Sequence, residues 1–213
     1  MIARGMLLSF SDPTAGLVPT MVPFQYNPAE VTRVLRVVPG QPGGPGLRVG
    51  AAPTETYTLK IELDALGAPD KALTRAMGVG PLLATLEAMM EPAGRSGLLG
   101  ALVGAVTAAV SLGGASLGGA VAPVPAPSLP LVVLAWSPER IVPVRIESYS
   151  AHETGFDELL QPVQATVDLS LVVLRDTDLA ADLVLARVLA NAYQAARSAL
   201  AVVGVAQGVE VMS

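Results

Sequence analysis

The chain has 213 residues, of which 52% are hydrophobic, 15% charged and 4% aromatic, and its formal net charge is −5. No run of Lys or Arg offers the basic surface that phosphate recognition needs, which argues against a nucleic-acid partner. The lack of Cys excludes a disulfide framework and thiolate metal sites, and it fits a cytoplasmic protein. Soluble monomers carry about a quarter charged residues, so neighbouring subunits or lipid are expected to cover part of the apolar surface.

The N-terminal region predicts two strands. Residues 17–25 form the first, which leads into Asn27 and Pro28; Asn before Pro predicts a turn or extended segment whose Asn side chain accepts backbone hydrogen bonds. Residues 31–38 alternate, but both faces carry Arg with Val or Leu, which predicts an edge strand or a partner-facing one. A flexible loop is expected over residues 39–53.

Residues 57–64 are the clearest strand signal in the first half of the chain. Four apolar side chains alternate with four polar ones, which predicts one buried face and one wet or partner-facing face. Between Pro81 and Pro92, Leu and Met recur at helical spacing. This spacing predicts a helix over residues 81–90 that covers the core.

A run of 25 residues from Leu98 to Ala122 contains no charge, a length that suits a transmembrane helix. Its many Gly and Ala residues, with Gly pairs at 113–114 and 118–119, weaken that interpretation. A single span would also separate the strand at 57–64 from the later strands, which could then not share a sheet. We therefore expect an insertion packed against protein, at about 93–130, and keep a membrane anchor as the alternative.

The second half predicts three more strands and a helix. Residues 129–136 are continuously apolar, which indicates a strand buried on both faces, and residues 142–149 alternate, with Pro143 favouring an edge or a strand start. Residues 164–173 alternate without error, and the 150–163 connection before them is expected to protrude as a loop. Helical spacing over residues 176–203 predicts a closing helix, capped by Asp176 or Asp178.

No group of residues points to catalysis. The single histidine, His152, has Ser148 and Ser150 nearby but no nucleophile elbow, and a solvated loop histidine is the plain alternative. Asp157 and Glu158 are adjacent in sequence and point apart in a regular segment. We expect a protein that is not an enzyme, with no cofactor and no metal.

Five segments resemble, in order, the tube-type domain of contractile injection systems, and are most similar to the baseplate tube adaptor of phage-tail-like particles related to antifeeding prophages. They are VPFQYNPAEVTR (22–33), TYTLKIELDALG (56–67), LLATLEAMMEP (82–92), LPLVVLAWS (129–137) and VRIESYSAHETGFDELLQPVQATVDLSLVVL (144–174). The family's opening motif and its final strand pair correspond here to Phe24, Tyr26, Asn27 and Pro28, then to Tyr149, Phe156, Pro162, Ala165 and Val167.

The resemblance implies a small antiparallel tube-type β-barrel with one packed helix, in a mainly β (α+β) chain. Its subunits would form a hexameric ring between spike and inner tube, as tube initiator or adaptor, with inner tube proteins, the spike and other baseplate proteins as partners. The protein would be cytoplasmic and assembled into a phage-tail-like particle, without nucleic acid and with membrane contact not expected. The alternative function is a membrane-anchored protein that displays a small β-domain through residues 98–122.

These expectations divide the chain into a barrel domain at 1–175 and a helical extension at 176–213. We expect Tyr57 and Trp136 to be core anchors, and the loops 39–53 and 150–163 to be contact surfaces. The structural and interface candidates are Phe24, Tyr26, Asn27, Pro28, Tyr57, Trp136, Tyr149 and Phe156.

Overall fold

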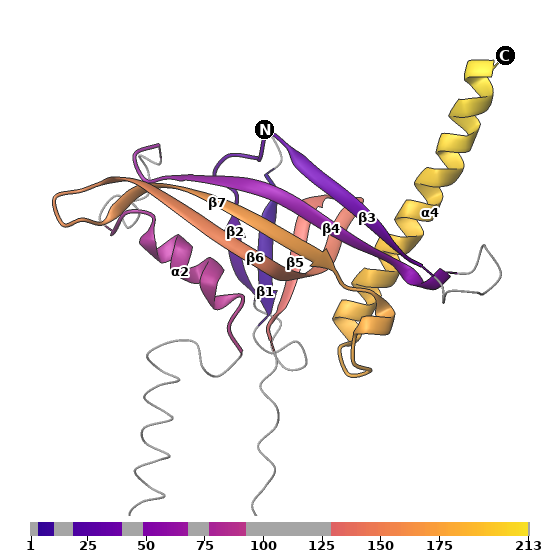
Figure 1. Cartoon of the computed structure of the whole chain (residues 1–213), viewed down its shortest axis with the longest axis horizontal. Coiled ribbons are helices and arrows are strands. Elements are labelled where there is room, and N and C mark those ends of the chain that lie inside the picture. The colour runs from indigo at the N-terminus through magenta and orange to yellow at the C-terminus, as the bar shows by residue number, and fades with distance from the viewer. Residues whose placement is uncertain (1–3, 11–18, 40–48, 68–76, 93–128, 213) are drawn as a thin grey trace, which may run out of the picture.

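The computed structural model describes residues 4–10, 19–39, 49–67, 77–92 and 129–212. Its strands form one seven-stranded antiparallel sheet in the order β2-β1-β5-β6-β7-β4-β3 (Figure 1). The strands are β1 (Met6–Phe10), β2 (Thr20–Pro23), β3 (Val31–Pro39), β4 (Val49–Asp64), β5 (Leu131–Ser137), β6 (Arg140–Phe156) and β7 (Pro162–Val173). The helices are α2 (Gly80–Ala88), the short 3-10 helix η1 (Asp176–Asp178) and α4 (Val184–Met212).

The mainly β, antiparallel architecture predicted from the sequence is confirmed. The order places β2 and β3 at the two edges, so the sheet of one chain is open and the expected barrel is not closed. β1 pairs with β5 and β4 pairs with β7, so strands from both sides of residues 93–128 share one sheet. This is the condition on which the argument against a single membrane span depends.

The expected insertion at 93–130 and the apolar run at 98–122 fall almost wholly outside the described residues. Within the described ranges, none of the helices has the length and apolar content needed to cross a bilayer.

β4 and β7 lie side by side with their alternations in phase. The register places Tyr57 opposite Leu171 and Ile61 opposite Val167, so the apolar side chains of both strands share one face. These residues are buried in the main core together with residues of β1, β2, β5, β6 and α2. The alternation of apolar and polar residues in these two strands therefore reflects a sheet with one buried face.

Two sequence expectations about loops are wrong. β4 begins at Val49, so the predicted loop at 39–53 is partly strand, although residues 40–48 lie outside the described residues. β6 continues to Phe156 and β7 begins at Pro162, so residues 150–163 are mostly a β-hairpin whose connection is residues 157–161. Few side chains in the outer half of β6 are buried on either face. Its sequence therefore shows no regular alternation of apolar and polar residues from which a strand could be predicted.

β5 is buried on both faces, as its unbroken apolar run predicts. Val132 and Leu134 join the main core, while Leu131 and Val133 form a second cluster with Ala186 of α4. Pro143 does not mark an edge, because it pairs with Val133 of β5 inside the sheet. The Pro143 carbonyl accepts a hydrogen bond from the Leu174 N–H, just past the end of β7. The position where Pro143 has no N–H faces the same side, beyond the last β6–β7 residue pair, so no hydrogen bond between the strands is lost.

The helix α2 confirms the prediction over residues 81–90 to within two residues at each end. Pro81 occupies its first turn, and Leu83 and Leu86 are buried in the main core. The Val79 N–H donates to the carbonyl of Pro162 over 2.8 Å, which fixes the start of α2 against β7.

The closing helix starts later than predicted, because residues 176–178 form η1 and α4 begins at Val184. Asp176 does not cap α4; its carboxylate accepts two hydrogen bonds from the Arg187 guanidinium, one turn into the helix. That pairing holds the pKa of Asp176 below its ordinary value.

Candidate assembly interface

Several strand edges in the described part of the chain have no neighbouring strand. The outer strands β2 and β3 leave one edge each. The outer half of β6 leaves another, because β5 pairs with β6 only from Arg140 to Val144, whereas β7 follows β6 as far as Phe156. Free edges present unpaired N–H and C=O groups and can accept another strand.

The edge strand β3 carries exposed apolar side chains on both faces, beside Arg33 and Arg36. Its register places Leu35 on the face of the sheet that carries the core and Val34 on the opposite face, while Val37 lies at the irregularity between Arg36 and Val38. All three are exposed, Val37 to 59%. Natural edge strands are usually shielded by charge, brevity or a covering element. The two arginines of this strand leave these apolar side chains exposed, which makes them candidates for a contact surface.

A broad polar face extends over β3, β4, β7 and the outer half of β6. The strand registers bring Ser and Thr side chains together on it, namely Thr32, Thr54, Thr56, Thr58, Ser148, Ser150, Thr154, Thr166 and Ser170. The six charged side chains that pair on this face divide equally into Arg36, Lys60 and Arg145 against Glu62, Asp64 and Asp168. The face is therefore hydrophilic with balanced charge.

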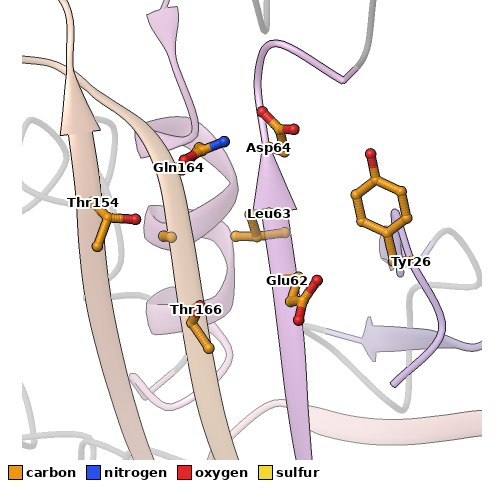
Figure 2. A pocket seen from close by; sticks show the side chains of 8 residues that line it. Tyr26, Glu62, Leu63, Asp64, Thr154, Gln164 and Thr166 are labelled. Atoms are coloured by element: carbon orange, nitrogen blue, oxygen red, sulfur yellow. The ribbon is translucent and has the colours of Figure 1, made fainter. Parts of the chain in front are cut away.

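α2 leaves this polar face uncovered. Leu83 and Leu86 of α2 pack in the same core cluster as Leu59 and Ile61, on the opposite side of β4. Figure 2 shows α2 behind the strands, while Glu62, Gln164 and Thr166 lie on them toward the viewer. One exposed cross-strand ion pair, between Lys60 Nζ and Asp168 Oδ1 at 3.5 Å, lies on this face.

The segment after β2 joins the polar face to the core. The Gln25 side chain bonds the backbone of Asp64 in both directions, through Nε2 to the carbonyl at 2.7 Å and from the N–H to Oε1 at 2.9 Å. Phe24 is fully buried, and its ring lies 6.2 Å from that of Trp136, which is half-buried. Asn27 Oδ1 accepts the N–H of Gly5 at 2.9 Å.

Tyr26 is exposed and, with Asn27 and Pro28, lines a shallow hollow beside Lys60 and Glu62. The four motif residues therefore differ in environment: Phe24 lies in the core, Asn27 bonds Gly5, and Tyr26 and Pro28 line the hollow. Sequence reasoning grouped Phe24, Tyr26, Asn27 and Pro28 together, and the structure keeps them contiguous but gives them different environments.

The other three aromatic candidates lie in different environments. Tyr57 is buried in the core. Tyr149 is partly buried on β6, and its hydroxyl is shielded from solvent without a hydrogen-bond partner among the described residues. Burial, with the Glu87 carboxylate nearby, raises the pKa of Tyr149 to about 12. Phe156 is exposed at the end of the β6–β7 hairpin.

The sequence analysis missed a buried carboxylate, Glu55, which is 1% exposed on the core side of β4. Arg33 Nε lies 3.0 Å from Glu55 Oε1, and Arg197 Nη1 donates to Oε2 at 2.7 Å. Tyr193 Oη donates to Oε1 at 2.6 Å, so Tyr57, which is 2.7 Å from Tyr193, donates to it in turn. This group joins β3, β4 and α4.

The environment of the two tyrosines follows from this arrangement. Burial raises the pKa of Tyr193, and the hydrogen bond to Glu55 adds to that effect. Burial also raises the pKa of Tyr57. The sequence position of Glu55 could have revealed its burial. Glu55 precedes Tyr57 by two residues, so both side chains point inward from the same face of the strand.

Three of the residues considered for catalysis lie on the polar face, in line along one strand. His152, Ser148 and Ser150 are exposed along β6. Asp157 forms the hairpin turn, and no group of acidic, His or Cys side chains in the described ranges could hold a metal ion.

No protein-family model matches the chain, and the search of curated proteins finds no relative. The assignment to a family therefore depends on the motifs quoted from the sequence and is carried forward as a proposal.

Proposed function

We propose that this chain is a structural ring component of a contractile injection system baseplate that connects the spike to the inner tube, as tube initiator or adaptor. The observation that carries the proposal is an open sheet with a polar, charge-balanced face and free strand edges. A wall built from such sheets would turn the polar face toward an aqueous channel. Helix α2 would stay on the other side of the wall.

The barrel expected from the resemblance would be completed between subunits. The β3 edge of one copy would pair with a free edge of its neighbour, so that backbone hydrogen bonds and the exposed side chains of Leu35 and Val37 hold the ring together. A heterologous contact of this kind closes into a ring when its rotation allows, and the resemblance implies that six copies close it.

The polar face supports a channel wall because Ser and Thr dominate it and its charges cancel. A wall of one sign would hold cargo of the opposite sign, whereas a neutral hydroxyl-rich wall binds neither acidic nor basic cargo strongly. The low charged fraction of the chain, 15%, also fits a subunit that is enclosed on several sides.

The test is the assembly state of the purified full chain. Light scattering after gel filtration and negative-stain images are expected to show annular particles of uniform size. Val37→Asp is expected to shift the population toward monomer, and Thr58→Asp, with the same charge change in the middle of the polar face, is expected to leave it unchanged.

A chain that stays monomeric at all concentrations would overturn the ring proposal. Recovery with lipid vesicles after a high-pH wash would instead support the membrane-anchored alternative.

A further inference from the structure

The turn between β6 and β7 holds its shape through Asp157. Asp157 Oδ1 accepts the N–H groups of Leu159 and Gln161, both at 2.8 Å, and the Asp157 N–H donates to the Gln161 carbonyl at 3.0 Å. The Leu160 N–H also donates to the Asp157 carbonyl at 3.0 Å. The connection is therefore hydrogen-bonded from one end to the other.

This ordered turn presents large apolar side chains to solvent. Leu159 is 76% exposed, Leu160 is 80% exposed, and Phe156 adjoins them at the end of β6. Leu160 adopts a φ of +61°, a left-handed conformation in which Gly or Asn would be expected. A turn that places leucines outward, one of them in an unfavourable backbone conformation, is suited to contact rather than to solvent.

A second exposed apolar surface is the distal half of α4. From Ser198 to Val205 the helix carries no charge, and Val202 and Val205 are each 71% exposed. Leu200 and Val203 are also exposed and lie on other sides of the helix at 100° per residue. A helix that is apolar on all sides is normally surrounded by protein.

The two surfaces lie toward opposite ends of the long axis of the molecule. The β6–β7 hairpin turn is at the left in Figure 1, and α4 extends away from the sheet at the right. One chain therefore cannot bring them together, but successive copies placed head to tail can.

We propose that the β6–β7 hairpin tip of one copy, residues 156–160, packs against the distal half of α4 in the next copy. The inference deepens the proposed ring, since it names a contact that would act beside strand pairing, and it depends on that ring. A second copy is favoured over a lipid surface because Asp157 and Glu158 lie within the tip, where anionic headgroups would repel them. The segment of α4 from Ser198 to Val205 places no acidic side chain opposite them.

Cysteine cross-linking tests the contact directly because the chain contains no natural Cys. Leu159→Cys and Val203→Cys chains of different tag mass are mixed and oxidised mildly. The mixed disulfide is expected in at least about tenfold excess over a control pair of Val203→Cys with Glu139→Cys, since a disulfide requires Cα atoms within about 7 Å. Equal cross-linking of both pairs would overturn the contact.

Leu160→Gly provides a second readout. Gly suits the φ of +61°, so the fold should keep its thermal midpoint while the apolar contact is lost. The dissociation constant of this variant, measured by light scattering, is expected to rise at least about tenfold, because one central interface side chain is lost. Unchanged association would count against the proposal.

The outcomes separate this inference from the proposed ring. Annular particles without selective cross-linking would refute the tip contact and leave the ring intact. A monomeric wild-type chain would refute both. Vesicle binding that Leu159→Asp abolishes would show that lipid is the occupant, contrary to the proposal.

Discussion

Replacing Glu55 with Gln removes the only carboxylate that neutralises the two arginines contacting it in the described structure. Arg33 and Arg197 keep their positions, but their side chains are 35% and 26% exposed, so water screens part of the uncompensated charge. Removing one partner of a fully buried ion pair costs about 3–5 kcal/mol. Partial exposure lowers the expected loss to about 2–3 kcal/mol in the free energy of unfolding, because exposed pairs contribute little.

Denaturant titration in the Val37→Asp background, in which the chain is expected to shift toward monomer, measures this loss. In a domain of this size the loss corresponds to a fall of roughly 4–12 °C in the thermal midpoint. Hydrogen exchange adds a specific readout. Amides of α4 around Tyr193 should exchange faster in the variant, while those between β4 and β7 should not, because Glu55 joins the helix to the sheet.

A double-mutant cycle separates this network from general damage. Glu55→Gln and Arg197→Met are expected to couple by about 1–3 kcal/mol, since the two side chains contact each other. A loss below about 0.5 kcal/mol for Glu55→Gln, or additive effects in the cycle, would refute the reasoning, because that is the scale of an ordinary surface substitution.

Three further substitutions test other parts of the fold. Gly78→Ala is expected to destabilise the chain by more than about 2 kcal/mol in denaturant titration, because Gly78 has a φ of +62° and an added Cβ would lie 2.2 Å from the Pro162 carbonyl oxygen. Tyr149→Phe is expected to be neutral or to stabilise by up to about 1 kcal/mol, since the buried hydroxyl has no partner in the described structure; a clear loss would indicate one. Tyrosine ionisation can be followed by ultraviolet absorbance as the pH is raised. In the Tyr149→Phe variant this titration should lose its step at about pH 12. Asp176→Asn is expected to be less stable than wild type at neutral pH, and the difference should vanish as the pH falls through the lowered pKa of Asp176, because a depressed carboxyl pKa stabilises only above it. A stability gap that does not narrow as the solution is acidified would contradict this.

The parts of the fold that could be predicted are those in which burial requires a regular spacing of apolar residues along the sequence. Strands β4 and β7 alternate because one face meets the core, and β5 is continuously apolar because Val132 and Val133 face two different clusters. Helix α2 could be placed because prolines bracket its apolar residues. In each case a local pattern and the tertiary environment agree.

Other parts could not be predicted because their determinants are not local. β1 has only five residues, and Leu7 and Leu8 serve different clusters, so no alternation marks it. The outer half of β6 is a strand because β7 pairs with it, not because a face is buried. The Glu55 network joins residues more than 130 positions apart, a relation that spacing in one sequence cannot show.

The exposed surface of the described chain separates into two kinds, and the separation bears on how copies would be arranged. The polar face of β3, β4, β7 and β6 is stable in water as it stands, because its hydroxyls are solvated and its charges are balanced. The apolar side chains at the β3 edge, the hairpin tip and distal α4 gain free energy only when something covers them, about 25 cal/mol for each Å² removed from water. Copies that associate through the apolar sites would leave the polar face free and continuous from one sheet to the next, which is the geometry that a water-filled channel requires.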